Sequence, residues 1–541
     1  MTPDAAGAET PQNRLDWLLA SGAFGPLAAD FRVIETHVSW VILSGDIAYK
    51  LKKPVDLGFL DFRSLAARRQ ACEEELRLNR RLAPDIYLGV VAVSAVAGDG
   101  TGSREEAVVE YAVKMRRFPP GAAVGAELAA GLKSDEAARL GELIGQFHRE
   151  LAPAPPGMPW GSADSVWSAI VASLAQLDAT LGASWAEQLA QCRRYISAEF
   201  SLRRGFVLDR QRCGAVRECH GDLHLGNLVR LGNRVVPFDA LEFDPALRWI
   251  DVMNEMAFLI MDLDVRGRRD LAFQALNGYL DITGDFAGLA GLRLYLSYRA
   301  LVRAKVASLS PIHASDGPGM ADLLAYAAKP LAGTLPILVV MAGVSGSGKS
   351  WLARQLSARL FAIHIRSDVE RKRLFAMAPL ARTDSAPGTG IYAADVSARV
   401  YARMADLAAT VLESGLPVIL DATSLRQAQR SLLLAAARRT GHPAVVVACS
   451  ADAKTLVQRV ARRASEARDP SEASIDVLQR QLAEFEPPDS MEGCHCVCVD
   501  TTNPLDLGAL VTAIGDIAGT PIRDAAHGFP GTTPGGQPKH T

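Results

Sequence analysis

The stretch ECHGDLHLGNLVRL, residues 218–231, decides how the first half of this 541-residue chain is interpreted. It brings two histidines, an aspartate and an asparagine close together, with glycines between them, which is compatible with either a metal site or a catalytic loop. A zinc site of the H-E-x-x-H type needs a helix and a glutamate directly after the first histidine. Gly221 and Gly226 disfavour a sustained helix here, so the metal interpretation is the weaker one.

The aspartate and the asparagine of this stretch favour a catalytic loop. Asp222 and Asn227 have the spacing H-x-D-x-x-x-x-N, in which the aspartate orients or deprotonates a hydroxyl and the asparagine binds magnesium. A further carboxylate is expected on the next strand, and RVVPFDALEF supplies Asp239. We therefore predict Asp222 as catalytic base and Asn227 and Asp239 as magnesium ligands, with the two histidines as scaffolding of the loop.

Such a site requires a lysine on a strand and a glutamate on a helix, because their ion pair fixes the lysine against the nucleotide phosphates. SGDIAYKLKKP offers Lys50 in a strand-like run, and ACEEELRLNRRL offers Glu75, with Glu74 as the alternative. No glycine-rich loop precedes the lysine, since only Ser44 and Gly45 mark the turn.

The second half carries a phosphate-binding loop. VVMAGVSGSGKS, residues 339–350, matches G-x-x-x-x-G-K-[ST] between an apolar strand and a helical run. The glycines let backbone N–H groups surround the phosphates, the lysine reaches the β- and γ-phosphates, and the serine hydroxyl binds magnesium. We predict the nucleotide-binding residues to be Gly343, Ser345, Gly346, Ser347, Gly348, Lys349 and Ser350.

Carboxylates and arginines elsewhere in this half favour a kinase over a motor ATPase. Asp368 follows a short strand, where it could accept the proton of an incoming hydroxyl, and Asp421 ends the strand LPVILDAT, where it could support the magnesium ion. Four arginines are candidate substrate or lid residues: Arg426, Arg430, Arg462 and Arg463. A solvated basic helix face is the alternative for each of them.

The pattern of apolar segments predicts two domains. Mixed strand-like and helical runs give way to a largely helical region, and after prolines and a glycine in AYAAKPLAGTLPILVV short apolar strands alternate with helices. This alternation indicates a parallel sheet covered on both faces. The predicted division is a flexible N-terminus at 1–14, a kinase-like domain at 15–329 with lobes at about 15–119 and about 120–329, a linker at 330–335, a P-loop domain at 336–520 and a disordered tail at 521–541.

Composition excludes several classes of protein. Apolar residues make up 49% and charged residues 22% of the chain, with a net charge of −2, which gives no overall attraction to nucleic acid or membranes. The N-terminus lacks an apolar segment and the apolar runs are short, so a cytoplasmic location is expected. The cysteines of CHCVCVD alternate with other residues, which is typical of a strand rather than of a zinc site.

These motifs carry two resemblances. ECHGDLHLGNLVRL, IGQFHREL and RWIDVMNEMAFL, with a structural Asp251, resemble the aminoglycoside phosphotransferase and choline kinase superfamily, which implies an α+β protein-kinase-like fold. The Walker A motif, SDVERKRL and LDATSLRQAQR resemble the small P-loop kinases grouped with gluconate kinase and polynucleotide kinase, which implies an α/β P-loop fold and Asp368 as base. The whole chain resembles bacterial proteins that join these two domains.

We therefore expect an ATP-dependent, Mg²⁺-dependent phosphotransferase with two kinase-type domains acting on hydroxyls of small molecules such as sugars or amino alcohols. One alternative is that the first domain is a nucleotide-binding regulatory pseudokinase. Another is a nucleic-acid end kinase, although no stretch of interleaved aromatic and basic residues supports it. The sequence leaves the acceptors and the oligomeric state open.

Overall fold

A computed structural model describes most of the chain, namely residues 11–20, 24, 31–56, 60–98, 104–119, 121–309, 318–381, 389–466, 474–488 and 494–519. The tail predicted to be disordered and residues 1–10 of the predicted flexible N-terminus lie outside these ranges, whereas 11–14 begin helix α1 (Pro11–Ala20). No helix within these ranges is long and apolar enough to cross a membrane.

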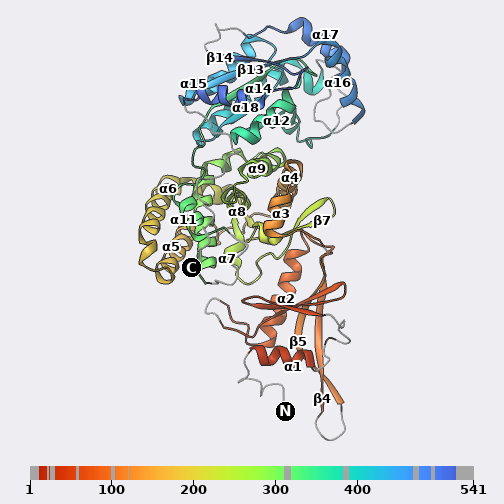
Figure 1. The fold of residues 1–541 in the computed structure, drawn as a ribbon, viewed down its shortest axis with the longest axis vertical. Helices are drawn as coiled ribbons and strands as arrows, with labels where there is room; N and C mark the ends of the chain where they lie inside the picture. Colours follow the sequence, from red (N-terminus) through yellow and green to blue (C-terminus); the bar gives the residue numbers. More distant parts are fainter. Residues whose placement is uncertain are drawn as a thin grey trace, which may run out of the picture. The chain divides into compact units, whose positions relative to one another are not determined.

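The chain forms two compact units, each made of discontinuous segments (Figure 1). Unit 1 comprises Met1–Glu136, Leu143–Asp262 and Gly291–Pro330, and unit 2 comprises Ala137–Glu142, Leu263–Ala290 and Leu331–Thr541. Unit 2 thus takes in a segment that precedes the predicted linker by several helices. The predicted domain limits stay a prediction.

The first part of unit 1 is an antiparallel sheet with the strand order β1-β2-β3-β5-β4. Its strands are β1 (Arg32–Glu35), β2 (Ser39–Ser44), β3 (Ile47–Lys52), β4 (Tyr87–Gly98) and β5 (Arg104–Arg116). Helix α2 (Leu65–Asn79) packs on β5 and begins at Ser64, whose hydroxyl accepts the N–H of Ala67 at 3.1 Å. Since alternate residues of a strand share a face, Ala48, Lys50 and Lys52 of β3 point the same way.

The remainder of unit 1 is mainly helical, with two short antiparallel ribbons. The ribbons pair β6 (Val216–Glu218) with β9 (Trp249–Asp251), and β7 (Leu228–Leu231) with β8 (Arg234–Pro237). Because Leu228 is opposite Pro237, the residues before β7 and after β8 emerge at the same end of that ribbon. The helices are α3 (Gly125–Gly131), α5 (Ala163–Thr180), η2 (Ala183–Trp185), α6 (Ala186–Arg212), η3 (Leu225–Asn227), α7 (Pro245–Arg248), α10 (Leu292–Leu309) and α11 (Met320–Ala328).

Helices α4 (Ser134–Glu150) and α8 (Val252–Val265) contribute residues to both units, and α9 (Arg269–Thr283) and η4 (Phe286–Gly291) follow them in the chain. The predicted order of a small α+β lobe followed by a helical region with embedded short strands is confirmed.

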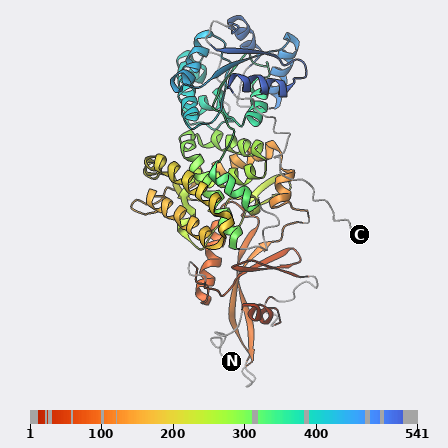
Figure 2. The same ribbon diagram turned by 60° about the vertical axis from the view of Figure 1, so that its left-hand side comes forward.

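Unit 2 contains a parallel sheet with the strand order β11-β12-β10-β13-β14. The strands are β10 (Leu338–Ala342), β11 (Ile363–Arg366), β12 (Val418–Asp421), β13 (Ala444–Ser450) and β14 (His495–Asp500). Helices lie on both sides of this sheet (Figure 2), as predicted for an α/β domain. The segment CHCVCVD forms the edge strand β14, which confirms the strand interpretation of its alternating cysteines.

The apolar face formed by Val339, Met341, Val445 and Val447 packs against α12 (Lys349–Leu360) and α18 (Leu507–Ile517). Helices α14 (Ala394–Glu413) and α15 (Gln427–Thr440) contact β12 and β10. The remaining helices of the unit are α13 (Ser367–Leu374), η6 (Gly390–Tyr392), α16 (Ala453–Glu466) and α17 (Ile475–Glu484).

Helix α9 covers the β11 edge of the parallel sheet. The Asn277 side chain donates from Nδ2 to the carbonyl of Ala362 at 3.0 Å, and its Oδ1 accepts the N–H of His364 at 2.8 Å. One amide side chain thereby imitates the pair of hydrogen bonds that a neighbouring strand would supply. An uncovered strand edge exposes such groups to pairing with other chains, so α9 completes this sheet.

Replacing Asn277 by alanine should destabilise unit 2, because the substitution leaves the N–H of His364 in β11 and the C=O of Ala362 just before it without these partners. We expect a loss of about 2 kcal/mol or more in the free energy of opening of β11, measured by hydrogen–deuterium exchange of peptides covering that strand in the full chain.

The matched control is Gln274→Ala on the same helix, which removes a side-chain contact to the Ser357 hydroxyl at 3.2 Å and leaves the strand backbone paired. Equal exchange of β11 in the two variants would contradict the role given to Asn277.

Candidate active sites

Lys50 lies at the centre of an ionic cluster in unit 1. Its Nζ is 2.9 Å from Oε1 of Glu75, and it also forms an ion pair with Asp239. Burial by itself would lower the pKa of Lys50, but the Asp239 and Glu75 carboxylates outweigh it and raise this pKa well above the usual value. The structure therefore joins the two residues that the sequence paired, Lys50 and Glu75, and keeps the lysine cationic.

A second lysine, which the sequence analysis missed, completes this cluster. Lys52 Nζ is 2.5 Å from Oε2 of Glu75 and also pairs with Glu242. Burial raises the pKa of Glu75, yet the two lysines together bring it down to about 2. The signal was present in IAYKLK, because alternation along a strand places both lysines on one face. The alternative residue Glu74 instead pairs with Arg77 and Arg248.

The catalytic-loop candidates Asp222 and Asn227 contact each other directly. Nδ2 of Asn227 donates to Oδ2 of Asp222 at 2.8 Å and to its backbone carbonyl at 3.0 Å. Burial raises the pKa of Asp222, but the nearby His224 and Arg303 hold it below its usual range, so the carboxylate is ionised. Since Asn227 uses its NH₂ group on Asp222, its amide oxygen is the atom available to a cation.

The two histidines of the loop have structural partners. The backbone N–H of Asp222 donates to Nδ1 of His220 at 3.3 Å, so Nδ1 carries the lone pair and Nε2 donates to the carbonyl of Phe238 at 2.9 Å. Burial lowers the pKa of His220 to about 4, which keeps the ring neutral. His220 thus ties the loop to the segment that precedes Asp239.

Two buried carboxylates, also missed by sequence reasoning, hold the backbone of the loop. Glu255 accepts the N–H groups of His220 at 2.7 Å and Gly221 at 3.0 Å, and Asp262 accepts that of Leu225 at 2.9 Å. Both acceptors come from α8, in the segment RWIDVMNEMAFLIMD. No local motif marks them, because their contacts join segments that are distant in sequence.

Asp239 adopts an unusual backbone conformation, with φ of 62°, directly after β8. Its N–H donates to the Tyr87 hydroxyl at 3.0 Å, and the next N–H, of Ala240, donates to Oδ1 of Asn79 at 2.8 Å. Left-handed backbone costs energy for a residue with a side chain, and it persists here because the hydrogen bonds fix it. Asn227 and Asp239 leave the same end of the β7–β8 ribbon.

The residues of this site suit magnesium. An amide oxygen from Asn227 and a carboxylate from Asp239 are hard oxygen donors, and magnesium is usually held by few protein groups together with water and phosphate oxygens. The described residues contain no cluster of three or more His, Cys, Asp or Glu side chains able to hold a metal ion.

In unit 2, the P-loop connects β10 to α12. Gly343, Gly346 and Gly348 have φ of 137°, 83° and 83°, and a Cβ on Gly343 would lie 2.3 Å from the carbonyl of Cys449. The loop therefore needs glycine for its conformation and for its close approach to β13.

The polar residues of the P-loop contact the loop itself and α17. Lys349 Nζ donates to the carbonyl of Val344 at 2.7 Å, so the lysine lies over its own loop. Ser350 follows in the first turn of α12, and Ser345 N–H donates to Gln481 at 2.7 Å.

Asp421 and Asp368 lie at the carboxyl ends of neighbouring strands. Asp421 ends β12, opposite Arg366 of β11, and its Oδ2 is 3.2 Å from Nε2 of His364. Burial raises the pKa of Asp421, but His364 and Arg366 hold it well below the usual range.

Asp368 is half-buried in the first turn of α13, just after β11. The Ser350 hydroxyl and the Asp421 carboxylate are oxygen donors of the kind that suits magnesium.

The four candidate arginines have different surroundings. Arg430 is fully buried and donates to the carbonyls of Ser424 at 2.9 Å and Leu425 at 3.2 Å, so its position does not support a substrate or lid role. Arg426 is exposed, with Nη2 3.1 Å from Oε2 of Glu484. Arg462 is exposed on α16, and the side chain of Arg463 lies outside the described residues.

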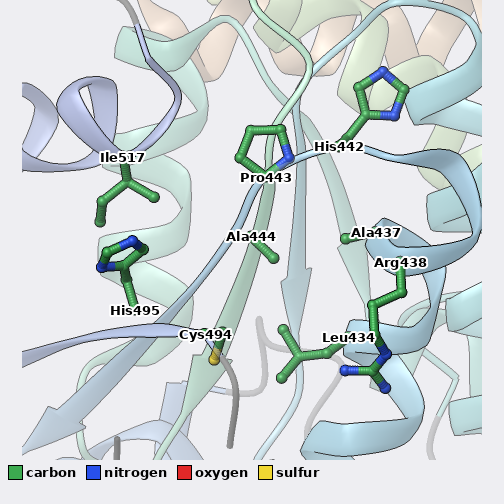
Figure 3. A pocket seen from close by; sticks show the side chains of 9 residues that line it. All are labelled: Leu434, Ala437, Arg438, His442, Pro443, Ala444, Cys494, His495 and Ile517. Atoms are coloured by element: carbon green, nitrogen blue, oxygen red, sulfur yellow. The ribbon is translucent and has the colours of Figure 1, made fainter.

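A hollow of about 280 Å³ lies elsewhere in unit 2, where β13 and β14 begin (Figure 3). The P-loop follows the carboxyl end of β10, and in a parallel sheet the amino ends of the strands lie at the opposite edge. The hollow contains none of the candidate site residues; its lining is Leu434, Ala437, Arg438, His442, Pro443, Ala444, Cys494, His495 and Ile517.

The chain is similar to several known proteins. A family model described as AAA domain matches residues 338–488. A gluconokinase from Sinorhizobium meliloti is 23% identical with a TM-score of 0.23, covering 31% of this chain and 85% of its own. A choline/ethanolamine kinase family protein from Mesorhizobium loti is 14% identical with a TM-score of 0.33, covering 59% of this chain and 99% of its own.

The Lys50–Glu75 ion pair and the Asp222 loop lie in unit 1, and the P-loop lies in unit 2, within the residues that the AAA domain model matches. The uncharacterized protein Rv2004c of Mycobacterium tuberculosis is 30% identical over 461 residues, which are 84% of this chain and 90% of that protein. The chain belongs to the same family as that mycobacterial protein.

The buried Glu255 predicts a pH dependence of stability. Burial raises its pKa from 4.5 to about 7 despite the opposing effect of Arg299. The folded state therefore retains a proton that the unfolded chain loses, so the associated stabilisation is complete below about pH 4.5 and is lost as the pH rises through about 7. Relative to Glu255→Gln, the wild type should lose up to about 3 kcal/mol of unfolding free energy between pH 5 and pH 8.

Urea unfolding followed by tryptophan fluorescence at several pH values measures this difference. Glu73→Gln on the exposed face of α2 is the control and should leave the pH profile of the wild type unchanged. The same profile for the wild type and Glu255→Gln would contradict the assignment.

Proposed function

We propose that this protein is a cytoplasmic ATP-dependent phosphotransferase whose two domains each transfer the γ-phosphoryl group of ATP to a hydroxyl of a small molecule. The observation that carries the proposal is Lys50, held between Glu75 and Asp239. A lysine fixed by a helical glutamate is the arrangement that grips the α- and β-phosphates in kinases. Lys50 also contacts Asp239, so the phosphate-binding lysine and the candidate magnesium ligand lie side by side.

In unit 1, Asp222 is the group that acts on the acceptor. The acceptor oxygen attacks the γ-phosphorus, its proton passes to the Asp222 carboxylate, and the bond to the leaving ADP breaks. The pKa of Asp222 lies below its usual range, so the carboxylate is ionised before the reaction and orients the hydroxyl. Magnesium bound by Asn227 and Asp239 would neutralise charge on the phosphates.

In unit 2, Lys349 would move from the carbonyl of Val344 to the β- and γ-phosphates, and the backbone N–H groups of the P-loop would surround them. Ser350 and Asp421 would hold magnesium with its water shell, and Asp368 would accept the proton of the second acceptor. Support comes from the position of these groups at the carboxyl ends of β10, β11 and β12, where ligands bind in parallel sheets.

One observation favours a second candidate function, a regulatory role for the first domain. In the β2–β3 hairpin Ser44 pairs with Ile47, so only Gly45 and Asp46 form the turn. A two-residue turn is too short to cover the phosphates as the glycine-rich loop of kinases does. If nucleotide binds there without reacting, its occupancy would instead bias the activity of the P-loop domain.

Product formation by single variants separates these possibilities. Full-length wild type, Asp222→Asn and Lys349→Ala are each incubated with ATP, magnesium and a metabolite extract, and products that gain the mass of one phosphate are identified. Loss of a general base typically costs about 10²- to 10⁴-fold in rate. We expect Asp222→Asn to abolish one set of products and Lys349→Ala another.

Asp209→Asn is a matched control, because this exposed aspartate on α6 pairs with Arg212 alone among charged groups of the described chain. Unchanged products in Asp222→Asn would exclude catalysis by the first domain. Loss of every product in Lys349→Ala, with none lost in Asp222→Asn, would favour the regulatory role.

A further inference from the structure

A cationic side chain lies beside the candidate base of unit 1 without a role in the site described so far. Arg303 of α10 places Nη1 3.3 Å from Nε2 of His224, and Nε2 is itself 3.4 Å from Oδ2 of Asp222. Arg303 also lowers the pKa of Asp222 electrostatically, so the guanidinium is close to the carboxylate. The side chains of Arg303, His224 and Asp222 therefore lie close together, although Arg303 comes from α10 and the other two from the loop.

The hydrogen bonds of the loop fix which nitrogen of His224 carries the proton. The N–H of Gly226 donates to Nδ1 at 3.0 Å, so Nδ1 must carry the lone pair. In the neutral ring the proton is then on Nε2. A side chain at position 226 would collide with the ring, because its Cβ would lie 2.7 Å from Cε1 of His224. The glycine and the ring orientation therefore depend on each other.

In this tautomer His224 offers no acceptor to the guanidinium of Arg303. Nη1 of Arg303 and Nε2 of His224 are both donors, so their 3.3 Å approach is not a hydrogen bond. Nε of Arg303 is buried and has no hydrogen-bond partner within the part of the chain that the structure describes. Leaving a charged donor buried and unpaired costs free energy unless a ligand supplies the acceptor.

The neighbouring arginine of the same helix, Arg299, differs from Arg303 at Nε, although its own Nη2 is buried without a partner among the described residues. Arg299, one turn earlier, donates from Nε to Oδ1 of Asn254 at 2.8 Å and stacks over the Phe258 ring at 4.7 Å. The Nε of Arg303, in contrast, has no acceptor within the described part of the chain. Its Nη1 lies beside Nε2 of His224, which in turn is close to Asp222.

We propose that Arg303 and His224 form an oxyanion subsite next to Asp222. Guanidinium and imidazole N–H groups bind phosphoryl or carboxylate oxygens through charge-assisted hydrogen bonds, which are roughly twice as strong as neutral ones. The oxyanion is either the terminal phosphoryl group of the nucleotide or an acidic group on the acceptor. This inference rests on the proposed function, since it assigns the subsite to the reaction centre at Asp222.

The subsite also narrows the class of acceptor for the first domain. An acceptor with a cationic amine next to the reacting hydroxyl would place that amine close to the guanidinium of Arg303. The two positive charges would repel each other. Neutral or acidic hydroxyl compounds are therefore favoured over amino alcohols. This preference restricts the acceptors that the sequence left open.

The test measures binding, so that it does not depend on turnover. The full chain carries Lys349→Ala to weaken phosphate binding by the P-loop. In this background Arg303→Gln and Arg303→Lys are compared for ATP and ADP affinity by calorimetry with magnesium present. Binding of inorganic phosphate to the ADP-saturated chain is followed by ³¹P NMR.

A loss of about tenfold in ATP affinity, with ADP affinity unchanged, identifies the terminal phosphoryl group as the oxyanion. If the variant loses binding of inorganic phosphate, and its affinities for ATP and ADP change by the same factor or not at all, the subsite is assigned to an acidic acceptor. Lys305→Gln removes a cation from the same helix on another side and should change neither result.

Unchanged ATP, ADP and phosphate binding in Arg303→Gln would overturn the proposal. Should the glutamine variant fail to fold, Arg303→Lys keeps the charge but loses the planar fork, and wild-type affinities in that variant would overturn it equally. If transfer by Asp222 is absent but the binding differences remain, the proposed function fails while the subsite stands.

Discussion

The buried carboxylate of Glu75 is the interaction on which unit 1 depends. It lies between two lysines of one strand, and each lysine reaches a further carboxylate, Asp239 or Glu242, in the segment after β8. A single buried charge left without its partner typically costs about 3–5 kcal/mol. Helix α2, strand β3 and the segment after β8 must therefore assemble together, and this requirement brings Asp239 to the lysine.

Buried carboxylates also hold the backbone of the loop that carries Asp222. Its N–H groups donate to Glu255 and Asp262, and His220 ties it to the carbonyl of Phe238. With the backbone held at several points, Asn227 is placed to donate to the Asp222 carboxylate. Such support is what a reactive group needs in order to be placed accurately.

Sequence reasoning succeeded where the informative residues are close together in the chain. The P-loop between a strand and a helix and the alternating strand at Cys496 are local patterns, and the parallel sheet that they predicted is confirmed, whereas the site predicted from the spacing of Asp222 and Asn227 stays a prediction. Lys52 could also have been predicted, since strand alternation places it on the same face as Lys50. Glu255 and Arg303 were not, because their contacts join distant segments and no motif marks them. Arg430 matched a pattern but is buried.

The position of Asn277 has a consequence for evolution and for protein production. A gene fragment encoding only the chain from the predicted linker at 330–335 onward would lack α9, and the edge of β11 would be bare. Bare edges invite pairing between copies and hence aggregation. The P-loop half is thus not a module that can be exchanged freely by recombination, because one of its necessary helices is encoded within the other half.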